Sequence, residues 1–324
     1  MHFEVVSLGE ILVEIMRKDR DVPHNVPAVY LGPYPSGAPA IFIDTAANLG
    51  LKSGFIGAVG DDDFGTLLIE KLREDGVDVS RIRVVKGYTT GTTFVMYYSS
   101  GTRRFIFHLR HSAAGQISLD PLDRKYIAES KLLHIMGSSL AVNEKSREAC
   151  YEALKIAEDS NIIVTFDPNL RPELLDVETI RRICWPAIKA CRVILPSGDE
   201  AAALTGIDDP VDAGRKLISI GPEVAVIKMG NRGSMAITRK EVIFKPSFKV
   251  SEVDPTGAGD VYDAAFAYGL LKNWRLNRIL EFANAAGAIK VTRFGPMNGP
   301  SSIREIEEFI RKHQKERTHI DSLI

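Results

Sequence analysis

The chain has 324 residues, which is long for one domain but common for a single α/β core with an added piece. Its formal net charge is −1, from 41 basic and 42 acidic residues, so no basic face indicates nucleic acid and no polybasic tract indicates a membrane. The longest apolar runs are too short to span a bilayer, and the first residues lack the zones of a signal peptide. The three cysteines show no CxxC spacing, which favours reduced thiols. We therefore expect a cytoplasmic protein.

The first third of the chain alternates strands and helices and then changes character. Apolar periodicity predicts, in order, a strand at Phe3–Leu8, a second at Ile11–Ile15, irregular structure or short strands over 18–35, a helix at Ala40–Leu49, a strand at Gly54–Val59 and a helix at Phe64–Asp75. Two β-rich runs follow at Thr92–Tyr98 and Arg103–Leu109, joined by a turn-like tetrapeptide. This hairpin interrupts the alternation, so we expect it to form a small separate sheet with part of residues 10–35.

The alternation then resumes and continues almost to the last residue. Strands are predicted at Lys131–Met136, Ile162–Phe166, Arg192–Leu195, Val224–Lys228, Ser234–Thr238, Val242–Phe244 and Phe248–Val253. Helices are predicted at Lys145–Ser160, Val177–Ala190, Asp199–Leu204, Val211–Ile220, Gly259–Lys272, Asn277–Val291 and Ile303–Lys315. Repeated β/α units imply an α/β protein with a mostly parallel sheet in three layers. Ligands bind such sheets beyond the carboxyl ends of the strands.

A turn with two glycines, Thr256-Gly257-Ala258-Gly259-Asp260, joins a strand-like run to a segment with helical spacing. Its backbone N–H groups point outward without side chains in the way, at the positive end of a helix dipole, so the turn can bind an anion. A carboxylate beside an anion site repels the ligand, unless it must take a proton from a hydroxyl that attacks the anion. Asp260 fits that role. An ordinary position in the first turn of a helix explains it equally well at this point.

Three further loops carry polar residues where strands end. Asp167, Asn169 and Arg171 follow one strand, and an Asx turn explains them as well as a ligand site does. Ser197 to Glu200 places acids at a helix start, where they could order a hydrated Mg²⁺ or simply favour the helix dipole. Lys228 to Gly233 is either a nucleotide-binding turn or a hairpin.

In this order the segments resemble the ribokinase-like carbohydrate kinases of the phosphofructokinase-B type, from Gly9 to about Pro300. Asp254 to Asp260 is similar to the family's DTxGAGD signature. Shorter matches are Gly37-Ala38-Pro39-Ala40, Gly60-Asp61 with Phe64-Gly65, and Phe282 to Gly287. The resemblance implies a single ribokinase-like domain over 1–324, with a Rossmann-like core and a small β lid from about 10–35 and 88–112. It also implies phosphorylation of a sugar hydroxyl by ATP and Mg²⁺.

The resemblance assigns a role to each matched position. Asp260 would be the catalytic base, and Gly257, Ala258 and Gly259 would donate N–H groups to the phosphoryl being transferred. Glu14, Gly37, Arg110, Asn169 and Arg171 would face the sugar. The nucleotide would lie along Ser197, Lys228, Gly230, Gly233 and Asn284. Glu200 would hold Mg²⁺ through water, and Asp254 and Thr256 match a loop that binds a monovalent cation such as K⁺ in some members.

Three positions depart from the commonest pattern of that family. Ser197 replaces the Asn of an NxxE motif, Ile41 replaces an Asn that usually touches the sugar, and Ser36 replaces the first glycine of a pair. The preferred hypothesis is a fructokinase-like enzyme acting on a primary hydroxyl of a ketohexose, because Glu14 suits sugar hydroxyls and opposes a substrate carboxylate. Its rival is a 2-keto-3-deoxygluconate kinase, because Arg110 and Arg171 could clamp a carboxylate. A nucleoside kinase, and a non-catalytic ligand-binding protein on the same fold, are less favoured.

The lid also carries an expectation about assembly. Apolar lid residues such as Phe94, Met96 and Phe105 suggest pairing with a second copy of the chain, or packing over the sugar.

Overall fold

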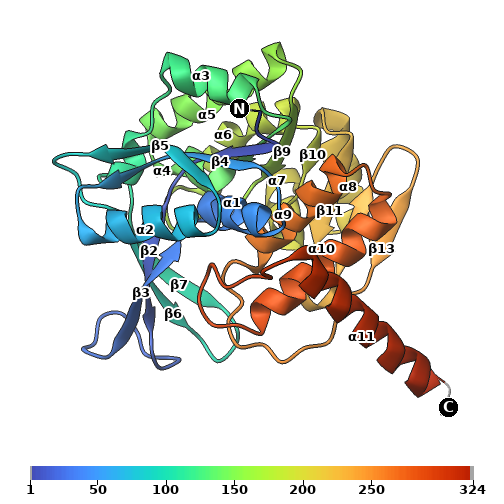
Figure 1. Cartoon of the computed structure of the whole chain (residues 1–324). Coiled ribbons are helices and arrows are strands. Elements are labelled where there is room, and N and C mark those ends of the chain that lie inside the picture. The colour runs from blue at the N-terminus through green and yellow to red at the C-terminus, as the bar shows by residue number, and fades with distance from the viewer. Residues whose placement is uncertain (1, 322–324) are drawn as a thin grey trace.

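A computed structural model describes residues 2–321, with side chains to residue 314. It contains two sheets, one of nine strands and one of four, which lie apart from each other (Figure 1). The large sheet has the order β13-β12-β11-β10-β9-β8-β1-β4-β5. Its strands are β1 (Val5–Leu8), β4 (Ser53–Gly60), β5 (Asp78–Val85), β8 (Leu132–Met136), β9 (Ile163–Asp167), β10 (Val193–Ile194), β11 (Val224–Lys228), β12 (Ser234–Ile237) and β13 (Val242–Lys245).

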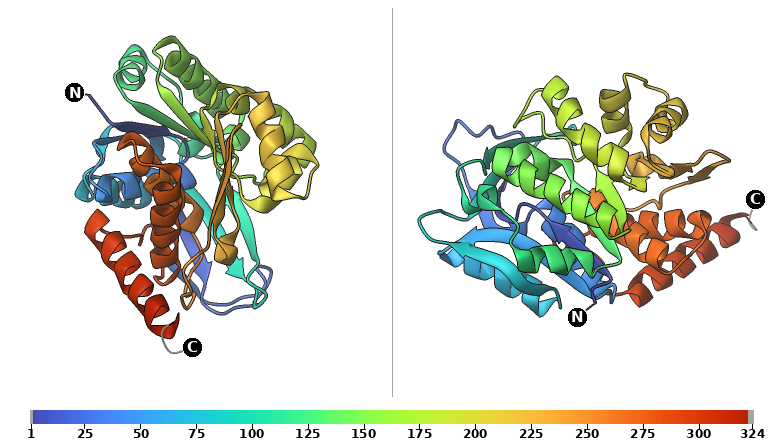
Figure 2. Two further views of the ribbon diagram at one scale, coloured as in Figure 1. Left: turned by 90° about the vertical axis from the view of Figure 1, so that its right-hand side faces the viewer. Right: turned by 90° about the horizontal axis from the view of Figure 1, so that it is seen from above.

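The large sheet is buried on both faces by two layers of helices (Figure 2). Neighbouring residues of β1 show why: Val5 belongs to one apolar core and Val6 to the other, and both are fully buried. The first core is covered by α1 (Ala38–Asn48), α2 (Asp63–Glu74), α9 (Ala258–Leu271), α10 (Leu276–Val291) and α11 (Ile303–Asp321). The second core lies beneath α3 (Pro121–Ala128), α5 (Glu144–Asp159), α6 (Val177–Ala190), α7 (Gly198–Thr205) and α8 (Pro210–Ile220).

The predicted three-layer fold with a mostly parallel sheet is confirmed. All pairings from β5 to β11 in the large sheet are parallel, and only β12 and β13 run antiparallel to their neighbours. The carboxyl ends of the parallel strands therefore share one edge of the sheet, where strand-to-helix turns meet.

The small sheet has the order β3-β2-β6-β7 and projects from the large one (Figure 1). Its strands are β2 (Leu12–Arg17), β3 (Tyr30–Ser36), β6 (Gly91–Tyr97) and β7 (Arg103–His108). The predicted hairpin corresponds to β6 and β7, and the other two strands come from residues 10–36, so the expected separate sheet is confirmed. Its central pairing, β2 with β6, is parallel and joins segments far apart in the sequence.

Several elements differ from the sequence-based predictions. The predicted strand at Phe248–Val253 is wrong, because this segment is irregular and Phe248 packs against Phe309 of α11 instead of joining a ladder. The strand β5 and the helices α3 and α4 (Gly137–Val142) were not predicted. A strand at β5 is hidden in the sequence because charged and polar residues interrupt its apolar ones.

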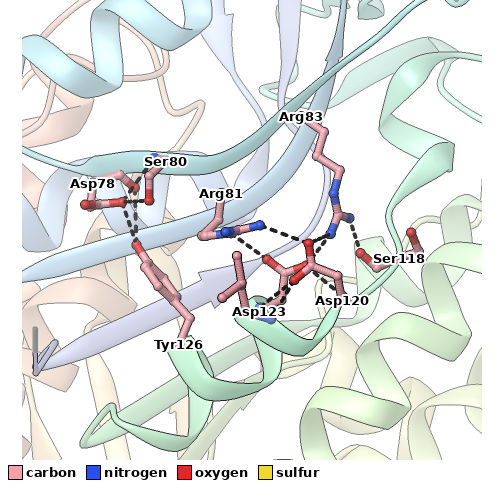
Figure 3. Close-up of polar contacts among 9 residues, drawn as sticks. Asp78, Ser80, Arg81, Arg83, Ser118, Asp120, Asp123 and Tyr126 are labelled. Atoms are coloured by element: carbon pink, nitrogen blue, oxygen red, sulfur yellow. Dashed lines mark hydrogen bonds and ion pairs between the residues drawn. The ribbon is translucent and has the colours of Figure 1, made fainter.

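Edge strand β5 is fastened to α3 by a cluster of ion pairs (Figure 3). Arg81 Nε donates to Asp123 Oδ1 at 2.8 Å and its Nη2 to Asp120 Oδ2 at 3.0 Å. Arg83 bonds the other carboxylate oxygen of Asp123, whose side chain is fully buried. The two guanidinium groups thus tie the edge strand to α3.

The cysteines Cys150, Cys184 and Cys191 are buried and free. Within residues 2–321, no helix combines the length and the apolar character needed to cross a membrane.

Candidate active site

A cavity of about 760 Å³ lies between the two sheets. Strands β2 and β7 of the small sheet contribute to one wall, and the turns after β9, β10 and β11 contribute to the other. Polar residues from segments far apart in the sequence therefore meet here, as expected for the carboxyl edge of a parallel sheet.

The glycine turn lies in this cavity and begins α9. Gly257 precedes the helix with φ 83°, a left-handed conformation that favours glycine, and a Cβ there would come within 2.5 Å of the carbonyl oxygen of Pro296. At the N-terminus of α9, Ala258 and Gly259 line the cavity, and the N–H of Ala258 donates to the carbonyl oxygen of Pro255 at 3.3 Å. The turn therefore places a helix N-terminus at the cavity wall, and its binding of an anion stays a prediction.

Asp260 follows in the first turn of α9, and its side chain is buried at the same cavity wall. Burial raises its pKa to about 7, and the charge of Asp167 acts in the same direction, whereas Arg171 and Lys228 oppose the shift. Asn169 Nδ2 lies 3.4 Å from Asp260 Oδ1. A carboxylate with a pKa near neutrality is suited to exchange a proton with a substrate hydroxyl.

A partly buried lysine links two acids near this turn. Lys228 Nζ lies 3.0 Å from Asp167 Oδ2 and 3.0 Å from Asp263 Oδ2. Burial raises the pKa of Asp263, whereas the charge of Lys228 holds the pKa of Asp167 below its usual value despite burial. Asp263 was missed in the sequence, although its position one helical turn after Asp260 was a usable signal. The ion pairs fix the loop after β9 against α9.

Glu200 faces the cavity from α7, where it completes a capping box with Ser197. Its two carboxylate oxygens accept from the backbone N–H groups of Leu170 at 2.8 Å and Ser197 at 2.7 Å. A carboxylate has about four acceptor sites, so two remain for water. Mg²⁺ keeps several water ligands and binds phosphate oxygens. Glu200 therefore fits a contact to Mg²⁺ through water, and its bonds hold the residue in position.

The sugar-facing residues predicted from the sequence mostly line the cavity. Glu14 is buried, accepts from Ser36 Oγ at 2.9 Å through Oε2, and leaves Oε1 without a partner among the described residues. Burial raises its pKa to about 7. Asn169 likewise has a buried, unpaired Oδ1, and its backbone makes the expected Asx turn with Asp167. Buried oxygens without partners are costly, so these two favour a ligand rich in hydroxyl groups.

Two arginines face this part of the cavity, and only one of them was expected there. Arg171 and Arg103 line it, whereas Arg110 is exposed and lies outside the lining. Within the described residues, neither Arg103 nor Arg171 has a carboxylate oxygen within 4.0 Å. Asp167, which lies in the same loop as Arg171, pairs with Lys228. Arg103 was missed because an alternating strand of a hairpin gives no sign of which face meets the cavity.

The other end of the cavity is lined by the residues expected along a nucleotide, including Gly230, Gly233 and Asn284. Asn284 is also structural, since it accepts from Ser234 Oγ at 3.0 Å and donates to the carbonyl oxygen of Lys245 at 3.0 Å. Among the described residues, no three carboxylate, histidine or cysteine side chains gather as a metal site.

The fold of this chain is ribokinase-like. The structure of a putative ribokinase II from E. coli, described as a complex with ATP and Mg²⁺, is similar with a TM-score of 0.89 and 38% identity, covering 96% of this chain and 100% of that one. The chain belongs to the pfkB family of carbohydrate kinases, whose profile matches residues 2–303. It is therefore a sugar kinase.

Curated relatives of the chain include kinases for sugar acids and for fructose. A 5-dehydro-2-deoxygluconokinase of Clostridium perfringens is 31% identical, over 97% of this chain and 94% of that protein. A 2-dehydro-3-deoxygluconokinase of Thermoproteus tenax is also 31% identical, over 95% and 94%. Fructokinase-1 of Zea mays is 30% identical, over 95% and 98%.

Proposed function

We propose that this kinase transfers the γ-phosphoryl group of ATP to a primary hydroxyl of a keto sugar, with Asp260 as the base. The main support for the proposal is the buried carboxylate of Asp260, whose pKa is raised to about 7. Asp260 lies in the first turn of α9, directly after the glycine turn. Asp260 would take the hydroxyl proton, and the N–H groups at the start of α9 would stabilise the transferred phosphoryl. Bound Mg²⁺ would neutralise phosphate charge, and Glu200 would hold one of its waters.

We further propose that the preferred keto sugar carries a carboxylate, as 2-keto-3-deoxygluconate and 5-dehydro-2-deoxygluconate do. Arg103 and Arg171 support this choice, because guanidinium groups without a protein carboxylate suit an acidic ligand. The names of two relatives agree with it. Fructose remains the second candidate, because the free Oε1 of Glu14 suits a sugar hydroxyl and would oppose a nearby carboxylate.

A coupled assay of ADP release tests the chemistry with a panel of neutral and acidic keto sugars. We expect sugar-dependent ADP release, and a kcat lower by roughly 10²–10⁴-fold in Asp260→Asn with ATP binding kept. Asp212→Asn is the matched control, since Asp212 is an exposed acid in the first turn of α8 and does not line the cavity. An Asp260→Asn enzyme with more than about a tenth of the wild-type kcat would show that Asp260 is not the base.

The same assay tests the substrate class. We expect kcat/KM for the acids to exceed that for fructose by at least about 10²-fold, because a site with unpaired charges rejects a neutral analogue. Arg171→Gln should remove most of that preference and leave kcat/KM for fructose within about threefold. A preference for fructose in the wild type would overturn the sugar-acid proposal and leave the role of Asp260 intact.

A further inference from the structure

A fully buried lysine lies against the loop that resembles a monovalent-cation site. Lys290 is in the last turn of α10 and has no exposed surface. Its Nζ donates to the carbonyl oxygen of Asp254 at 3.0 Å and to that of Arg293 at 3.1 Å. These two carbonyls belong to different segments, one leading into the glycine turn and the other following α10. Lys290 therefore joins the segments that bracket the anion-binding turn.

Four protein donors already bond the three oxygens of Asp254 in this loop. K⁺ is bound by oxygen atoms that replace its hydration shell, often backbone carbonyls. Asp254 Oδ1 accepts from Thr256 N at 2.9 Å and from Tyr97 Oη at 3.1 Å, and Asp254 Oδ2 accepts from Gly295 N at 2.9 Å. The Asp254 carbonyl bonds Lys290. The residues present thus do not fit the K⁺ site that the family resemblance suggested.

The charge at the loop leads to the same conclusion. A buried carboxylate and a bound K⁺ would neutralise each other, but here the ammonium of Lys290 already acts on Asp254. Burial lowers the pKa of Lys290, whereas the carboxylates of Asp254 and Glu14 oppose that shift. A lysine near the end of a helix is ordinary when exposed, because it bonds the last carbonyls. Complete burial, and a bond to a carbonyl outside its own helix, are not explained by that role.

We propose that Lys290 is a built-in cation that takes the place of K⁺ and positions the Asp254–Asp260 loop, so that the enzyme works without a monovalent cation. The inference rests on the proposed function, because the loop it positions holds the anion-binding turn and Asp260. Lys290 is a positioning residue, since it reaches the site through the Asp254 backbone and not through a substrate.

The test compares the wild-type chain of 324 residues in KCl and in tetramethylammonium chloride at equal ionic strength. We expect the kcat values in the two salts to agree within about twofold. An enzyme activated by bound K⁺ would show a larger difference, since an effector typically changes a ligand's affinity by roughly 5–150-fold. Thermal unfolding without substrates should also be equal in the two salts, because a cation that binds only the folded protein would raise the melting temperature. A saturable rise of kcat or of melting temperature with KCl in the wild type would overturn the proposal.

Two variants sharpen the test. Lys290→Ala opens space beside the Asp254 and Arg293 carbonyls, so its kcat and melting temperature should fall and then recover with KCl but not with tetramethylammonium. Lys290→Met fills the space without a charge, so it should lose kcat and show no recovery with KCl. A Lys290→Ala enzyme that folds and ignores KCl would contradict the proposal. If neither variant folds, the comparison of the wild type in the two salts still tests the proposal. Its thermal unfolding measurement does so even if the protein phosphorylates no sugar in the assay.

Discussion

Asp260 combines two demands that oppose each other at the scale of a single residue. The proposed role as a base requires its carboxylate beside an anion site, and burial at this position raises its pKa to about 7. The folded protein therefore binds a proton that the unfolded chain, with the ordinary pKa of 3.8, releases at lower pH. Asp260 thus lowers the free energy of unfolding increasingly as pH rises from about 4 to about 7. The position proposed for the base therefore reduces the free energy of unfolding at neutral pH.

We expect Asp260→Asn to raise the melting temperature of the ligand-free protein relative to wild type, and by more at pH 8 than at pH 5. The amide cannot ionise, so the variant does not lose the free energy of unfolding that the wild type loses as pH rises above the unfolded pKa of Asp260. In the wild type, log kcat/KM should rise with a slope of about one below pH 7 and level off above it. Thermal unfolding at the two pH values and a pH–rate profile measure these effects. Equal stability differences at pH 5 and pH 8 would show that Asp260 does not titrate between them.

The glycine turn and Asp260 could be proposed from the sequence because they are neighbours in the chain. A glycine pair before a helix, here Gly257 and Gly259, has few other uses. Arg103 and Asp263 could not be assigned in the same way, because their roles depend on which face of a strand or helix meets the cavity. Ile41, where an amide was expected, also lines the cavity beside Gly37.

At the scale of elements, β5 shows why some of the fold was not predicted. Its sequence mixes apolar residues with Arg81 and Arg83, a pattern that is typical of a surface loop. The strand pairs with β4, and α3, itself unpredicted, supplies Asp120 and Asp123 as partners for the two arginines. Neither element is recognisable without the other. The buried strands β1, β8 and β9 needed no such partner, because continuous apolar runs identify them.

Asp123→Asn tests this dependence. We expect a loss of roughly 2–4 kcal/mol in the free energy of unfolding, because Asp123 is fully buried and its charge pairs with two partly buried arginines. Arg304→Ala is the control: it breaks an exposed pair with Glu308 and should change stability by less than about 1 kcal/mol. Urea unfolding at pH 7 measures both. An Asp123→Asn protein as stable as the control would mean that β5 is held by its ladder with β4 alone.

At the scale of the whole molecule, the small sheet touches the glycine turn through few polar contacts. Tyr97 Oη lies 2.6 Å from Thr256 Oγ1, and Arg103 Nη1 lies 3.3 Å from the same oxygen. The sheet can therefore close over the cavity when a substrate adds contacts, which would keep water from the phosphoryl group. That role as a lid, the single domain and a dimer formed through the lid all remain predictions.

Closure predicts slower hydrogen exchange in β2, β6 and β7 when a sugar substrate and a non-hydrolysable ATP analogue are both bound. The backbone amides of these strands should gain protection because the small sheet is pressed against the core, while β8 and β9, already buried, should not change. Hydrogen exchange followed by mass spectrometry measures each strand. The analogue alone serves as the control. Equal protection with the analogue alone would show that the sugar does not close the lid.

The small sheet is assembled from two insertions in the chain, and this limits how its specificity can be exchanged. Glu14 comes from β2 in the first insertion and Arg103 from β7 in the second, and the two insertions meet in the parallel β2–β6 pairing. A chimera that receives only one insertion from a relative would break that shared ladder. Recombination between members of this family should therefore succeed when residues 10–36 and 88–112 are transferred together, as one inherited unit.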